Sequence, residues 1–151
     1  MEKINLNDLK KLRNETSASI ADCRAALEES KGDYKKALAW IKKREQEKAE
    51  KKADRSTSQG LIHCYIHQNG KVGAMIELLC ETDFVARTDE FKNLAHEVAM
   101  QVAAMNPKDV ETLLKQEYIR DGSQTIEKLV KAVIGKLGEN IIVKKIIRFE
   151  I

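Results

Sequence analysis

The chain has 151 residues, of which 42% are hydrophobic, with one proline and seven glycines. This composition allows one ordinary domain, or a small domain beside a larger one, and excludes a repeat array or a disordered chain. Its 27 basic and 24 acidic residues are too evenly balanced for a protein that holds nucleic acid by charge. We therefore expect protein partners and no direct contact with nucleic acid.

The beginning of the chain and its cysteines indicate where the protein works. Met1–Asn5 leads directly into an amphipathic pattern, and no apolar run approaches the roughly 20 residues of a membrane span. We expect a cytoplasmic protein without a membrane segment. Cys23, Cys64 and Cys80 are too few and too scattered for a disulfide scaffold. Buried free thiols are expected, and an intermolecular bridge stays open as the alternative.

Three short helices are predicted at the N-terminus. The first ends near Asn14, where cap-forming hydroxyl residues follow. Ser19 begins the second with a capping-box-like spacing to Asp22, and Gly32 is placed to end it. Asp33 can cap the third. Together the three predict a miniature bundle.

The third helix is expected to continue as a solvated helix and then as a linker. From Lys42 to Arg55 the apolar stripe stops, and seven basic residues mix with four acidic ones. A nucleic-acid arm is the alternative, which the acids and the absence of aromatic residues disfavour. Ser56–Gly60 supplies a break. We expect one domain in residues 1–55 and a second in residues 56–151.

A β-hairpin is predicted from Leu61 to Leu79. A three-residue loop ending at a left-handed Gly70 gives a register with one clean core face. That face would hold Ile62, Cys64, Ile66, Val72, Ala74, Ile76 and Leu78. The opposite face would hold His63, Tyr65, His67, Met75, Glu77 and Leu79, which is apolar enough for a contact surface.

The junction that follows the hairpin is the best candidate for a functional site. Thr82–Ala86 carries an acid and an aromatic residue between a strand and the helix that begins near Thr88. Such a turn is held by rigid elements on both sides but belongs to the face of neither. From the residues alone, Phe84 either plugs the core or is free for a partner, with the plug favoured.

The rest of the chain predicts helices and a last strand. A helix runs from Thr88 to Met105, a short one follows Pro107, and another is closed by Gly138. The final stretch is β-branched and alternating, with Ile141, Val143, Ile147, Phe149 and Ile151 on one side. It is expected to join the hairpin. The fold class is therefore α+β, with a small antiparallel sheet packed with helices.

No catalytic or metal-binding pattern stands out. His63 and His67 lie about 13 Å apart on a strand, too far to chelate one ion, and Cys64 points the other way. The sequence has no glycine-rich phosphate loop and no nucleophile elbow. We expect no enzyme, no cofactor and no bound metal.

Three stretches, in order, resemble the elongation factor Ts family. The first comprises Leu12, Arg13, Thr16, Ala18, Ile20, Asp22, Cys23, Ala26 and Leu27, and it resembles a signature in a three-helix domain of the ubiquitin-associated type. Glu81–Arg87 resembles the second signature, and Gly138–Ile141 a third stretch. Arg148–Glu150 ends the chain as in the family. The resemblance implies a ubiquitin-associated-like bundle in residues 1–55 and a core (dimerisation) domain in residues 56–151.

The resemblance implies a guanine nucleotide exchange factor for elongation factor Tu in protein biosynthesis. It would bind GDP-bound Tu and promote GDP release by disturbing the magnesium and phosphate site. Asp83 and Phe84 match the residues that enter the partner beside the magnesium ion, with Phe84 as the wedge. Thr82 and Val85 would shape the turn.

Further partner contacts follow from the same resemblance. Arg13, Ile20 and Ala21 match the positions at which the family's N-terminal domain docks on a helix of the partner. The hairpin faces the partner's third domain, which makes His67 a further candidate. Serines flank Ala18 where the family has glycines, and Ala21 stands where a larger apolar residue is common. N-terminal docking is therefore expected to be weaker or differently shaped.

The short length has its own implication. The chain resembles single-core forms of the family and lacks the coiled-coil insertion that they often carry. Such forms pair as homodimers, and the apolar outer hairpin face agrees with that. Two rival functions remain: a protein-interaction module without exchange activity, and a nucleic-acid-binding protein using Lys42–Lys52.

Overall fold

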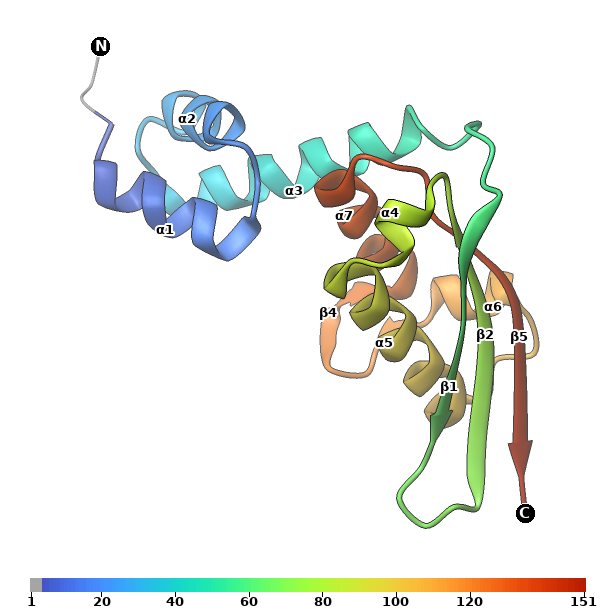
Figure 1. The fold of residues 1–151 in the computed structure, drawn as a ribbon. Coiled ribbons are helices and arrows are strands. Elements are labelled where there is room, and N and C mark those ends of the chain that lie inside the picture. The colour runs from blue at the N-terminus through green and yellow to red at the C-terminus, as the bar shows by residue number, and fades with distance from the viewer. Residues whose placement is uncertain (1–3) are drawn as a thin grey trace.

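One long helix joins a small helical bundle to a larger part made of a sheet and helices (Figure 1). The computed structural model describes residues 4–151, so residues 1–3 of the expected N-terminal part lie outside the described residues. The predicted α+β class is confirmed, with a helical bundle followed by an antiparallel sheet of order β1-β2-β5. In residues 4–151 no helix has both the length and the hydrophobicity to cross a bilayer.

Each helix of the bundle begins with a side-chain cap, as predicted for the second and third helices. Its helices are α1 (Leu6–Thr16), α2 (Ile20–Glu29) and α3 (Tyr34–Glu50). The side chains of Asn5, Ser19 and Asp33 each accept a hydrogen bond from a backbone N–H of the first turn. The buried cluster of the bundle consists of Leu12, Cys23, Ala26, Leu27, Ala37 and Ile41.

The sheet contains the hairpin and the last strand, as expected. Its strands are β1 (Gln59–Ile66), β2 (Val72–Cys80) and β5 (Ile142–Glu150). The hairpin register differs from the prediction by one residue, because the loop has four residues, Gln68–Lys71, and is closed by a bond from His67 N–H to the Val72 carbonyl. Gly70 is left-handed, as predicted, with φ 69°. The extra loop residue moves every side chain of β1 to the other face of the sheet.

The core face of β1 is therefore opposite to the predicted one. Tyr65 pairs with Ala74 and His63 with Ile76, and these side chains turn toward the helices. Ile62, Cys64 and Ile66, predicted to be core residues, are exposed. The prediction of buried thiols is confirmed for Cys23 and Cys80 and is wrong for Cys64, whose exposure follows from the register.

A bulge divides the last strand between the two faces of the sheet. The pairing of β2 with β5 shifts between Glu77 and Leu78, so Val143 is buried whereas Ile147 and Phe149 are exposed. The prediction of one apolar side for the whole strand was wrong, since an extra residue at a bulge reverses the alternation.

Helices cover the inner face of the sheet, with α5 packed on β1 and β2 (Figure 1). They are α4 (Asp83–Ala86), α5 (Asp89–Met105), α6 (Val110–Lys115) and α7 (Ile126–Leu137). Thr88 caps α5 and a left-handed Gly138 ends α7, both as predicted. A small ribbon, β3 (Glu117–Tyr118) with β4 (Asp121–Thr125), was not predicted because its second strand is polar.

α3 belongs to both parts of the molecule, which corrects the prediction that it is solvated beyond Lys42. Its buried residues are Ala37, Ile41, Glu45 and Ala49. Ala49 joins the larger core, and Glu45 packs against Gly135 of α7. In the charged stretch Ala49 is the buried apolar residue of this contact, and a single alanine does not form an apolar stripe. The sequence pattern therefore did not reveal that α3 packs on α7.

Candidate functional site

The turn between β2 and α5 presents Phe84 to solvent. Thr82 caps α4 through a bond that its hydroxyl accepts from Val85 N–H. The side chains of Val85 and Ala86 pack on the core, whereas Phe84 is 77% exposed. The interpretation of Phe84 as a core plug is therefore wrong. The turn leaves most of a large apolar ring open to solvent.

Asp83 lies next to this ring and is half-exposed. Its carboxylate forms an ion pair of 2.8 Å with Arg87, one helical turn later. The pair is solvent-exposed on both sides, so it contributes little to stability. Asp83 thus remains accessible to a partner that can compete with Arg87.

The turn rests on the loop that follows α7. The Glu139 carboxylate accepts hydrogen bonds from the N–H groups of Glu81 and Thr82 at 3.1 and 3.0 Å, and from the Thr82 hydroxyl at 2.6 Å. The Cys80 thiol donates to the Thr82 carbonyl, and burial, followed by the Glu139 charge, raises the pKa of that thiol. Glu139 was noted in the sequence only as part of a family stretch, and its role in the site was missed.

The N-terminal candidates gather at the corner between α1 and α2. Arg13 is exposed in the last turn of α1, and Ile20 and Ala21 are exposed at the start of α2. Ile20 is 52% exposed although it is a large aliphatic residue. The three positions form one accessible corner of the bundle.

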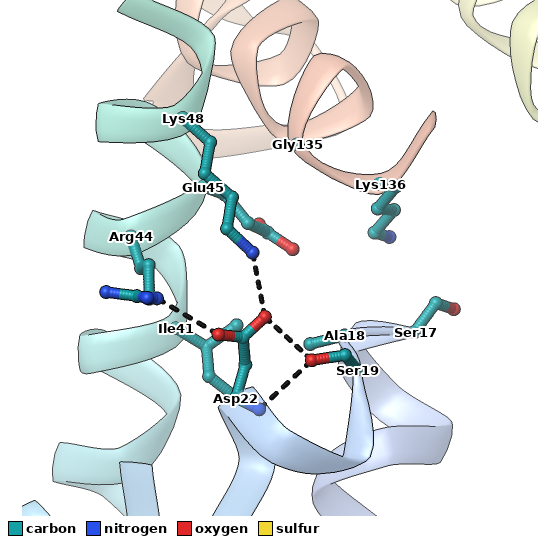
Figure 2. Close-up of a pocket in the computed structure, with 10 residues that line it drawn as sticks. All are labelled: Ser17, Ala18, Ser19, Asp22, Ile41, Arg44, Glu45, Lys48, Gly135 and Lys136. Atoms are coloured by element: carbon teal, nitrogen blue, oxygen red, sulfur yellow. Dashed lines mark hydrogen bonds and ion pairs between the residues drawn. The ribbon is translucent and has the colours of Figure 1, made fainter. Parts of the chain in front are cut away.

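A cavity of about 280 Å³ lies beside this corner, between the α1–α2 loop, α3 and the end of α7 (Figure 2). Asp22 points into it and accepts bonds from Arg44 at 3.0 Å, Lys48 at 2.7 Å and the Ser19 hydroxyl at 2.8 Å. Burial acts to raise the pKa of Asp22, but the bonds from Lys48, Ser19 and Arg44 outweigh it and lower the pKa. These ion pairs connect α2 to α3, so the polar residues of this cavity have a structural role.

A buried carboxylate shares the same cavity. Glu45 faces Gly135, and burial raises the pKa of Glu45 despite the opposing charges of Lys136 and Lys48 (Figure 2). A Cβ atom at position 135 would lie 2.8 Å from the Glu45 Cβ. Only glycine therefore allows this approach of α7 to α3.

The three histidines of the chain surround Tyr65. His63 Nε2 lies 3.3 Å from His96 Nδ1, and His67 Nδ1 lies 3.3 Å from the Tyr65 hydroxyl. His67 is at the hairpin loop, whereas Phe84 follows the other end of β2. A nine-residue strand spans about 26 Å, so the structure does not bring these two candidates together.

The outer face of the sheet carries several exposed apolar side chains, with Glu77 and Lys145 lying among them. It carries Ile62, Ile66, Met75, Ile142, Ile147 and Phe149, all exposed. Tyr65, predicted for this face, lies on the inner face instead. In residues 4–151 no group of three or more His, Cys, Asp or Glu side chains is placed to hold a metal ion.

Comparison with known proteins assigns the chain to a family. A family model described as Elongation factor TS matches residues 81–151. Elongation factor Ts of Coprothermobacter proteolyticus is 39% identical, covering 97% of this chain and 98% of the relative. Elongation factor Ts of Thermotoga neapolitana is 38% identical, covering 99% and 98%, and that of Nostoc sp. is 43% identical, covering 99% of this chain and 47% of the relative.

The alignments also show that this chain is shorter than its relatives. Those with the first two relatives extend over 192 positions, but this chain has 151 residues, so at least 41 positions (192 less 151) have no counterpart here. The identity over nearly the full length of both proteins is nevertheless well above chance. The chain belongs to the elongation factor Ts family of translation elongation factors.

Proposed function

We propose that the chain is a guanine nucleotide exchange factor for GDP-bound elongation factor Tu, with Phe84 as the wedge that disturbs the partner's magnesium site. The observation that carries this proposal is the exposure of Phe84 on a turn whose neighbours are anchored in the core. A free phenylalanine offers rigid apolar area without a charge to desolvate. Asp83 acts beside it, and Thr82 and Val85 hold the turn in shape.

The proposed mechanism requires no chemistry from the chain. An exchange factor must bind a state of the partner in which the magnesium and phosphate contacts are broken. By linkage, the nucleotide then weakens factor binding as much as the factor weakens nucleotide binding. The chain makes and breaks no covalent bond, so it is not an enzyme in this proposal.

A second contact is proposed at the corner of the bundle. Arg13 supplies a charge, and Ile20 and Ala21 supply apolar surface against a helix of the same partner. The exposure of Ile20 supports this contact, because large aliphatic side chains are more often buried. His67, exposed at the hairpin loop, is proposed to meet the partner's third domain.

We also propose that the chain works as a homodimer in the bacterial cytoplasm. The outer face of the sheet supports self-association, since it exposes Met75, Ile147 and Phe149 together, and apolar side chains gathered on one face are typical of interaction sites. Relatives from bacteria support the location. Residues 1–55 would serve docking and residues 56–151 exchange and dimerisation, with α3 packed on both parts.

The test is the release of labelled GDP from elongation factor Tu, with and without the chain. The wild-type chain should accelerate release. Phe84→Ala should reduce the effect at least about tenfold, because burying a phenylalanine ring is worth about 1.5–3 kcal/mol. Ile119→Ala is the matched control, since it removes another exposed apolar side chain away from the proposed contacts.

Two outcomes would contradict the proposal. No acceleration by the wild-type chain would favour the rival interaction module, which has no effect on a nucleotide. A folded Phe84→Ala chain that exchanges GDP at the wild-type rate would retain the exchange function but reject the wedge.

A further inference from the structure

Two loops that are distant in the sequence hold each other by reciprocal hydrogen bonds. Glu139 accepts from the backbone of Glu81 and Thr82, and the Glu81 carboxylate in turn accepts from Asn140 N–H at 2.8 Å. Each carboxylate satisfies backbone donors of the opposite loop. Because ionised acceptors make the stronger hydrogen bonds, this contact is firm as well as specific.

A third segment joins the same contact. The side chain of Asn140 is buried and donates to the carbonyl oxygens of Ala53 and Arg55, at 3.2 and 2.9 Å. Arg55 also lies 3.6 Å from the Glu81 carboxylate. The end of α3, the turn that carries Phe84 and the loop after α7 therefore meet around Glu139 and Asn140.

The turn depends on this support because α4 is too short to be stable alone. It has four residues, and forming a first helical turn is unfavourable without outside contacts. Glu139 accepts hydrogen bonds from the Thr82 hydroxyl and from the N–H groups of Glu81 and Thr82, which precede the helix. Without it, these donors lose their partner and the chain entering α4 is released.

We infer that Glu139 is the positioning residue for Phe84: it fixes the turn so that the ring is preorganised for the partner. This inference rests on the proposed exchange function. Preorganisation lowers the entropy lost when the wedge engages, and so acts on the step after binding. The bundle corner of Arg13, Ile20 and Ala21 still supplies initial docking.

The experiment measures GDP release from elongation factor Tu against factor concentration, for Glu139→Ala, Glu139→Gln and the control Glu111→Ala. Glu111 is an exposed glutamate whose ion-pair partner, Lys115, is on its own helix. Glu139→Ala should lower the maximal rate about tenfold and change the half-saturating concentration less than about threefold. Glu139→Gln should restore most of the rate, because its amide oxygen still accepts the two N–H bonds.

A double-mutant cycle separates positioning from general stability. If Glu139 acts through Phe84, adding Glu139→Ala to Phe84→Ala should lower the maximal rate by less than about twofold. Amide hydrogen exchange of the free chain should also speed up at Glu81 and Thr82 in Glu139→Ala. That measurement needs no partner.

Each alternative outcome is decisive. The positioning role would be overturned if the effects of Glu139→Ala and Phe84→Ala were fully additive, or if Glu139→Ala left the maximal rate unchanged. In both cases acceleration by the wild-type chain would still support the exchange function. If Glu139→Ala does not fold, Thr82→Ala, which removes both the 2.6 Å bond and the cap of α4, tests the support of the same turn in the cycle with Phe84→Ala. A wild-type chain without activity would instead reject the exchange function itself, and with it any role of Glu139 in exchange.

Discussion

Phe84 and Phe91 are seven residues apart, yet the first is 77% exposed and the second is fully buried. Thr82 caps α4 and Thr88 caps α5, so the two rings lie on separate helices. The burial of Val85 and Ala86 uses the inner side of α4 and leaves Phe84 outside. Because both rings have the same hydrophobicity, the position of the preceding helix start determines whether each ring is exposed or buried.

At the same scale, His63 gives the fold a dependence on pH. Burial, followed by the neighbouring His96 ring, lowers the pKa of His63 below its ordinary 6.5. Between the lowered pKa and 6.5 the unfolded chain binds more protons than the folded chain, so stability rises with pH in this window and falls on acidification. We expect His63→Gln to weaken the dependence of the free energy of unfolding on pH just below about pH 6.5, measured by urea denaturation. Parallel curves for the two proteins would exclude this role.

Among the elements, the contact of α3 with α7 joins the bundle to the core. Besides the Glu45–Gly135 contact, Gln46 donates to the Lys128 carbonyl at 3.3 Å, and Lys131 lies 3.7 Å from the Glu50 carboxylate. The polar contacts are exposed and weak. The close approach at Gly135 is therefore the specific part of this joint.

We expect Gly135→Ala to reduce the free energy of unfolding by about 1–3 kcal/mol. A methyl group there would meet the Cβ, Cγ and Cα of Glu45 at 2.8, 2.9 and 3.1 Å, and the overpacking outweighs a gain of about 1 kcal/mol in helix propensity. The control is Gly122→Ala, where the nearest atom is 3.9 Å away. Urea denaturation of both variants checks this, and a stabilised Gly135→Ala would refute it.

The comparison of elements with the sequence shows which signals are reliable. Helices with a cap and an apolar stripe were predicted well, because both signals are local. The two faces of the hairpin were predicted wrongly. One additional loop residue, Lys71, moves the side chains of β1 to the opposite face of the sheet, and the composition of the strand gives no sign of this. The turn from Thr82 to Val85 was found from its place between two elements. The role of Glu139 at this turn was not predicted, because Glu139 and Thr82 are 57 residues apart in the sequence.

For the whole molecule, the outer sheet face predicts the oligomeric state. At micromolar concentration we expect a mass near 34 kDa, twice the 17.1 kDa of one chain, by light scattering. Phe149 is 71% exposed in this face, and Phe149→Glu should give monomers because it places a charge in an apolar contact. Leu6→Glu, at an exposed site in the bundle, should stay dimeric. A monomeric wild-type chain would contradict the proposal.

The buried residues of α3 stand at every fourth position: Ala37 and Ile41 in the bundle, Glu45 against Gly135, and Ala49 in the core. Four residues turn a helix by about 400°, so this buried line winds about 40° at each step. The angular phase of α3 therefore determines where the bundle corner points relative to Phe84. One residue added between Ile41 and Glu45 would lengthen the molecule by only about 1.5 Å but twist its two ends by about 100°. The number of residues in this stretch is thus constrained more tightly than their chemical type.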